Sequence, residues 1–214
     1  MPGARDEGDD SRAGAVDIVL FDLGGVLIDF GGVDRMKELA RIEDDELLWH
    51  RWLTCPWVRR FECGACSDAD FAAGMVDEWE LDLTPEDFLD QFQSWLGGPL
   101  PGAEALLDEV RRTHPAGCLS NTNALHWEQN FIRWPILDAF DFRFLSFQLG
   151  IVKPDRALFE RVAELLPIDA RRVLFLDDNL VNVESAREVG FVAAHVRGVE
   201  EAREALVDAG VLGG

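Results

Sequence analysis

Four short apolar runs constrain the fold of this chain most, and three of them end in polar residues. They are DIVLFD at 17–22, GCLSN at 117–121, VLFLDD at 173–178 and FVAAHV at 191–196. Continuous apolar runs separated by helical patterns are typical of parallel strands that are covered on both faces. They predict an α/β fold with a doubly wound parallel sheet, and FRFLS at 142–146 is a candidate fifth strand.

Helical patterns separate these runs. GAEALLDEVRRT at 102–113 has apolar residues at helical spacing, and PDRALFERVAELL at 154–166 places Pro154 in a first helical turn. NVESAREVG at 182–190 ends on Gly190, a residue suited to a helix C-cap.

Residues 32–97 differ because they hold amphipathic helical segments and no evident strand. Ser67 and Thr84 suit helix N-caps, and five of the seven tryptophans fall here. We expect a small all-helical cap domain inserted after the first strand, with the α/β core at 15–31 and 98–214. Most of the tryptophans should pack inside the cap rather than form an exposed protein-binding surface.

The net charge of −21 disfavours a nucleic-acid partner, because an acidic surface repels phosphate backbones. No apolar run approaches the length of a membrane span, and MPGARDEGDDSRAGA lacks the apolar centre of a signal peptide. We therefore expect a cytoplasmic protein with no membrane partner and a disordered tail at 1–14. CGAC at 63–66 has redox or zinc spacing, but no second pair accompanies it, which favours reduced thiols.

Polar residues at the ends of three predicted strands point to a site. Asp22 follows the first, Ser120 and Asn121 end the second, and Asp177 and Asp178 end the third. Ligands of a parallel sheet bind beyond the carboxyl ends of the strands, so these side chains should converge. Each residue alone has an ordinary explanation as a cap or turn former, and the convergence is what favours a site.

The residue types suit phosphate chemistry on a small phosphorylated metabolite. An aspartate that attacks phosphorus forms an acyl phosphate, which water hydrolyses. Gly24 and Gly25 allow backbone conformations that are closed to other residues, so the chain can approach a ligand closely. Converging carboxylates suit Mg²⁺, and the ammonium of Lys153 can neutralise phosphate charge. Successive strand residues point to opposite faces, so Asp177 and Asp178 should serve a cation and the neighbouring loop separately.

Four segments in this order resemble the motifs of the haloacid dehalogenase-like (HAD) hydrolase superfamily: FDLGGVL, LSNTN, KPD and FLDDNLVNVESAREVG. Order and spacing agree over about residues 16–200, and the insert resembles the helical cap of the first subclass. The motif variants look most like the branch that contains α-D-glucose-1-phosphate phosphatases and the phosphatase domain of soluble epoxide hydrolases. The resemblance implies a Rossmann-like core and a Mg²⁺-dependent phosphomonoester hydrolase.

The resemblance also implies residue roles. Asp22 would be the nucleophile that forms an aspartyl-phosphate, and Asp22, the backbone carbonyl of Gly24 and Asp178 would hold Mg²⁺. Asp177 would be a supporting acid near the lysine or the metal.

The resemblance implies further residue roles in binding the phosphoryl group and neutralising its charge. Ser120, Asn121 and Lys153 would bind the transferring group, and Lys153 would assist catalysis. The rival haloacid dehalogenase needs no metal and usually has Ser-Asn in place of Asp177-Asp178, so the acidic pair favours the phosphatase.

One position departs from the superfamily pattern. Most of its phosphatases have an aspartate two residues after the nucleophile, where this chain has Gly24. That acid protonates the leaving oxygen, and such help is worth about 10²–10⁴-fold. Three explanations stay open: an easily leaving group such as a sugar 1-phosphate, another proton donor, or a non-catalytic ligand-binding protein. The branch resemblance favours the first, and Asp29 and His126 are the donor candidates, although surface roles are favoured for both.

Overall fold

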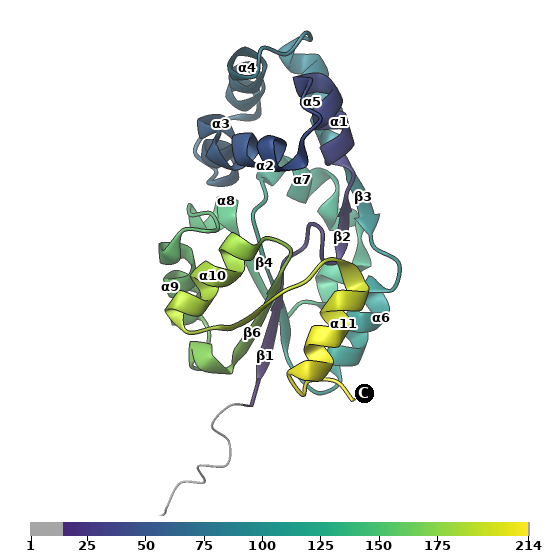
Figure 1. Ribbon diagram of the computed structural model, residues 1–214, viewed down its shortest axis with the longest axis vertical. Coiled ribbons are helices and arrows are strands. Elements are labelled where there is room, and N and C mark those ends of the chain that lie inside the picture. The colour runs from purple at the N-terminus through teal and green to yellow at the C-terminus, as the bar shows by residue number, and fades with distance from the viewer. Residues whose placement is uncertain (1–14, 214) are drawn as a thin grey trace, which may run out of the picture.

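The computed structural model describes residues 15–213, so the predicted tail at 1–14 lies outside the described residues. A five-stranded sheet has the strand order β5-β4-β1-β6-β7, and every neighbouring pair is parallel (Figure 1). The strands are β1 (Ile18–Phe21), β4 (Ala116–Ser120), β5 (Phe142–Leu145), β6 (Val173–Asp177) and β7 (Val192–His195). The four predicted strands and the fifth candidate are confirmed, each within one residue at either end.

Burial on both faces explains why the three central strands have no polar alternation. Every residue of β1, β4 and β6 is buried. The central strand β1 lies between β4 and β6, with Leu20 in register with Gly117 on one side and Phe175 on the other. The predicted doubly wound, Rossmann-like α/β fold is therefore confirmed, and the carboxyl ends of these three strands are neighbours.

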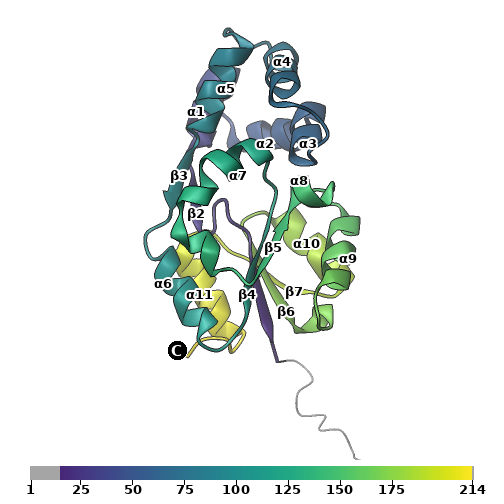
Figure 2. The ribbon, with the colours of Figure 1, turned by 180° about the vertical axis from the view of Figure 1, so that it is seen from behind.

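Helices cover both faces of the sheet. Figures 1 and 2 show α6 (Ala103–Arg111) and α11 (Gly198–Asp208) on one face, and α9 (Arg156–Leu165) and α10 (Leu180–Val189) on the other. Shorter helices connect the strands: α7 (Ala124–Gln129), α8 (Ser146–Leu149) and the 3₁₀ turns Phe131–Arg133, Pro135–Ala139 and Ala170–Arg172.

Of two predictions about helix ends, one is confirmed and one is wrong. Gly190 caps α10 with φ 109°, a left-handed conformation that favours glycine, as predicted. The expected place of Pro154 in a first helical turn is wrong, because α9 begins at Arg156 and Asp155 is its N-cap residue. Pro154 precedes the helix, where the missing N–H removes no helical hydrogen bond.

The insert between β2 (Ile28–Phe30) and β3 (Leu96–Pro99) contains α1 (Gly32–Ala40), α2 (Asp45–Thr54), α3 (Pro56–Glu62), α4 (Asp68–Glu78) and α5 (Pro85–Gln93). These five helices, here called the cap, lie beyond the carboxyl ends of the sheet strands (Figure 1). Ser67 and Thr84 cap α4 and α5 as predicted, because each hydroxyl accepts a backbone N–H three residues later.

A short ribbon joins the cap to the core. β2 and β3 are antiparallel, with Ile28 in register with Pro99. The expectation that 32–97 contains no strand is therefore wrong at its end, since Leu96 and Gly97 belong to β3. The sequence LGGP has little intrinsic strand preference, so pairing with β2 makes this strand.

An aromatic cluster forms the interior of the cap. Phe61 and Phe71 stack with ring centroids 4.0 Å apart, and Trp52, Trp79 and Trp95 are all buried. The prediction that most cap tryptophans are packed inside is confirmed, whereas Trp57 is partly exposed and Trp49 is 38% exposed.

Replacing Phe71 tests how much this cluster contributes to stability. Phe71 is fully buried, so Phe71→Ala should lower the free energy of unfolding by about 3–5 kcal/mol. Leu47→Ala is the control, because Leu47 is 56% exposed and its loss should change stability by less than about 0.5 kcal/mol. Urea unfolding of both variants measures these free energies. Equal losses of stability in the two variants would contradict a stabilising role of the aromatic cluster inside the cap.

Candidate active site

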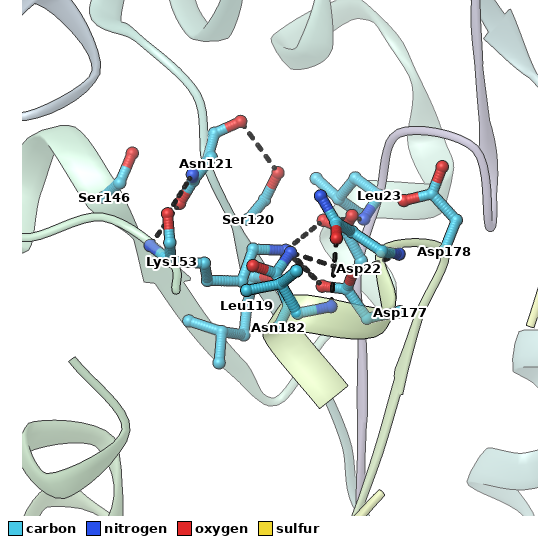
Figure 3. Close-up of polar contacts among 12 residues, drawn as sticks. Asp22, Leu23, Leu119, Ser120, Asn121, Ser146, Lys153, Asp177, Asp178 and Asn182 are labelled. Carbon is cyan, nitrogen blue, oxygen red and sulfur yellow. Dashed lines mark hydrogen bonds and ion pairs between the residues drawn. The ribbon is translucent and has the colours of Figure 1, made fainter. Parts of the chain in front are cut away.

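A buried lysine links two of the strand ends. The Nζ of Lys153 lies 2.9 Å from Oδ1 of Asp22 and 2.6 Å from Oδ2 of Asp177. It also donates to the carbonyl of Leu119 at 3.1 Å. Both aspartates are buried, and the lysine is 3% exposed. This ammonium therefore bridges residues that lie far apart in the sequence (Figure 3).

Asp177 is occupied by neighbouring groups of the protein. Its carboxylate accepts from Nδ2 of Asn182 at 2.9 and 3.1 Å and from the backbone N–H of Asn179 at 2.8 Å. Together with Lys153, these donors place Asp177 where it orients a loop and a cation. Sequence reasoning missed Asn182, although its position five residues after Asp177, on the first turn of α10, is a usable signal.

Asp178 lies on the other side of Asp22 from the lysine (Figure 3). One carboxylate oxygen from each of Asp22, Asp177 and Asp178 lies within 4.8 Å of the other two. Three carboxylates so close, with one ammonium among them, form an oxygen-rich site with excess negative charge. Such a donor set fits a hard divalent cation such as Mg²⁺.

The two glycines after Asp22 differ. Gly25 has φ 72°, and a Cβ there would lie 2.2 Å from Oδ2 of Asp178. Gly25 is therefore required by the backbone and by the approach of Asp178. The expectation that both glycines are needed for unusual conformations is wrong for Gly24, whose φ is not positive and whose added Cβ would meet nothing within 4 Å.

The end of β4 contributes a hydroxyl and a bracing amide. Ser120 is buried beside the cavity, and its Oγ lies 3.4 Å from the carbonyl of Asn121. The side-chain amide of Asn121 donates to the Lys153 carbonyl at 3.0 Å and accepts from the Lys153 N–H at 2.8 Å. Asn121 thus fixes the backbone that carries the lysine, and its side chain is directed to that task.

Burial and neighbouring charges set the ionisation of the cluster. Burial raises the pKa of Asp22 to about 7; Asp177 and Asp178 add to this, and Lys153 opposes it. Burial would lower the pKa of Lys153, but Asp177 and Asp22 outweigh it and hold the pKa above its usual value. The Lys153 ammonium is therefore charged near neutral pH, and additional positive charge would favour ionised Asp22.

A cavity of about 590 Å³ extends from this cluster to the cap. Its floor includes Asp22, Ser120, Lys153 and Asp178. The apolar part of its walls comprises Ile28, Phe30, Val33, Trp49, Trp52, Leu53, Phe92, Leu96, Leu100 and Phe131. The cavity therefore combines a charged end with a largely apolar remainder, as small-molecule sites commonly do.

The two proton-donor candidates, Asp29 and His126, also line this cavity, with different surroundings. The surface role expected for His126 is wrong: the residue is 4% exposed, its ring stacks on Phe92, and Nε2 lies 2.8 Å from the Phe92 carbonyl. Burial lowers the pKa of His126 to about 4, so the ring is neutral near pH 7. Asp29 is exposed, as expected.

The fold and the site define a class: a doubly wound α/β protein with an aspartate at the tip of its central strand, a buried lysine and a carboxylate cluster. A family model described as haloacid dehalogenase-like hydrolase matches residues 16–190, and the chain belongs to this family. The prediction of a HAD-like hydrolase is therefore confirmed.

Individual relatives and solved structures are similar to this chain over most of its length. The chain is 28% identical to a phosphatase of Mycobacterium tuberculosis over 90% of this chain and 93% of the relative. It is 27% identical to a D-ribitol-5-phosphate phosphatase of Bacteroides thetaiotaomicron over 81% of this chain and 88% of the relative. A crystal structure of a HAD family enzyme from Bacteroides thetaiotaomicron matches with TM-score 0.67 and 25% identity, covering 86% of this chain and 94% of that one.

Within residues 15–213, none of the helices combines the length and apolar character that crossing a membrane requires.

The neighbouring glycines provide a matched pair of variants. Gly25→Ala should lower the free energy of unfolding by about 1–2 kcal/mol from its left-handed backbone alone, with a further loss from the contact with Asp178. Gly24→Ala should change stability by less than about 1 kcal/mol, because its Cβ meets open space. Chemical denaturation tests this, and similar values for both would contradict the different roles of the two glycines.

Proposed function

We propose that this chain is a Mg²⁺-dependent phosphomonoester hydrolase that works through an aspartyl-phosphate on Asp22. The observation that carries the proposal is the Lys153 ammonium held between Asp22 and Asp177, beside Asp178 and beneath a cavity. A phosphoryl dianion placed there would meet a nucleophile on one side and a fixed positive charge on another.

Each residue takes a role from its position. A carboxylate oxygen of Asp22 attacks phosphorus, and water later hydrolyses the acyl phosphate. Lys153 and Ser120 hold the phosphoryl oxygens, while Asp177 fixes the lysine. Since its side chain is directed to the Lys153 backbone, Asn121 supports phosphate binding mainly by positioning the lysine.

Asp22, Asp178 and the backbone carbonyl of Gly24 would hold Mg²⁺. When bound, the ion offsets the negative charge of the carboxylates and the phosphate. A dehalogenase has no need for this concentration of carboxylates, and a ligand-binding protein has no need for a buried nucleophile beside a fixed ammonium. Both alternatives are therefore less well supported.

The substrate is a small phosphorylated metabolite whose leaving group occupies the upper cavity. Since Gly24 offers no acid, the leaving oxygen either leaves easily, as in a sugar 1-phosphate, or receives its proton from another group of the protein. The apolar walls favour a leaving group with apolar surface beside its phosphate, because burying that surface adds to binding. Cytoplasmic location stays a prediction from the sequence.

Phosphate release with and without Mg²⁺ tests the proposal. The panel comprises glucose 1-phosphate, glucose 6-phosphate, ribitol 5-phosphate, benzyl phosphate and 4-nitrophenyl phosphate. EDTA should abolish turnover and Mg²⁺ should restore it. Asp22→Asn should lower kcat by about 10³-fold or more, since it removes the nucleophile.

Asp138→Asn is the matched control, because the Asp138 side chain is 91% exposed and its removal should leave turnover unchanged. Metal-independent turnover, or activity retained in Asp22→Asn, would overturn the mechanism. Chloride release from 2-chloropropionate in EDTA would instead establish the dehalogenase.

A further inference from the structure

Glu62 is an acidic side chain of the cap that lines the cavity above Asp22 and Lys153. It is the last residue of α3 and is partly buried. No neighbour among the described residues is a hydrogen-bond partner of its carboxyl group. Glu62 is therefore available to a ligand that occupies the cavity.

Two contacts hold this part of α3 against the core. Arg59, one turn before Glu62, forms an ion pair with Asp155, which lies two residues after Lys153. Gly64, two residues after Glu62, adopts φ 67°, and a Cβ there would lie 2.7 Å from the carbonyl oxygen of Phe147. Glu62 therefore lies between two fixed points at which the cap meets the core.

The charges around Glu62 belong to the site. Burial raises the pKa of Glu62 to about 8; Asp22 adds to this, whereas Lys153 and Arg59 oppose it. The group is thus mainly a neutral carboxylic acid near pH 7, with a proton to donate. Gly24 offers no acid, and the neutral ring of His126 is engaged by Phe92.

We propose that Glu62 is the proton donor for the leaving oxygen, supplied by the cap in place of the acid missing at Gly24. The inference rests on the proposed phosphatase function. It assigns the two halves of the reaction to the two parts of the chain: the core carboxylate attacks phosphorus, and the cap carboxyl group serves the leaving group.

The proton balance is complete with water as the only co-reactant. As a carboxylate oxygen of Asp22 bonds to phosphorus and the bond to the leaving oxygen breaks, the Glu62 proton passes to that oxygen and an alcohol departs. Water then attacks the aspartyl-phosphate, the bond between phosphorus and Asp22 breaks, and one water proton returns to Glu62. Inorganic phosphate is released, and both carboxyl groups regain their starting states.

Glu62→Gln tests the role because Gln keeps the shape of the side chain and removes the proton. For benzyl phosphate, whose alkoxide needs protonation, kcat/KM should fall by about 10²–10⁴-fold. For 4-nitrophenyl phosphate, whose phenolate leaves without a proton, kcat/KM should stay within about 3-fold of wild type. The variant should also show a burst of 4-nitrophenolate, because hydrolysis of the aspartyl-phosphate has lost its base.

Controls separate this role from structural ones. Glu78→Gln changes an exposed cap carboxyl group that does not line the cavity, and it should leave both kcat/KM values unchanged. Gly24→Asp should restore benzyl phosphate turnover in the Glu62→Gln background, since Gly24 has room for a side chain. Equal losses on both substrates, or no loss on either, would overturn the donor role while wild-type turnover keeps the phosphatase proposal intact. Absence of wild-type turnover on the whole panel would remove both.

The pH dependence provides an independent readout. Glu62 donates only while protonated, so wild-type kcat/KM for benzyl phosphate should fall as pH rises through about 8. The carboxyl faces Lys153, Asp22 and Arg59. The raised pKa of Lys153 keeps its ammonium charged through that range. The basic limb should be absent in Glu62→Gln, and its persistence there would assign it to another group.

Discussion

The site depends on one buried ammonium. Lys153 contacts Asp22, which follows β1, and Asp177, which ends the adjacent strand β6. It also donates a hydrogen bond to the carbonyl of Leu119 on β4. Removing a partner from such a cluster leaves an uncompensated buried charge, which is strongly destabilising. The same interaction that orders the strand ends therefore also sets the charge that a phosphoryl group would meet.

The sequence predicted the sheet because its physical signal is local. Each of the three central strands, β1, β4 and β6, is an apolar run that ends in or just before a polar residue, as a sheet covered on both faces requires. Convergence of Asp22 and Asp177 followed from the geometry of parallel strands alone. The β2–β3 ribbon was missed because Leu96–Pro99 becomes a strand only through its partner, which no window of sequence contains.

The direction of individual side chains was the other feature that the sequence could not predict. Asn121 and Ser120 occupy equivalent-looking positions at a strand end, yet the Asn121 amide turns toward the Lys153 backbone. His126 resembled a surface residue because nothing local shows that Phe92 covers it. The position of Glu62 above the site could not be predicted for the same reason. Nothing in the sequence distinguishes it from the other glutamates of an acidic chain, and only the fold places it in the cavity.

A proton donor near neutral pH needs a pKa raised well above that of a free carboxyl group, and the position of the acid decides what raises it. Glu62 reaches this condition mainly through burial in a cavity with apolar walls. A cap acid of this kind can serve an alkoxide leaving group only while the cap lies against the core, so the contacts of Arg59 and Gly64 belong to the chemistry as much as to the fold.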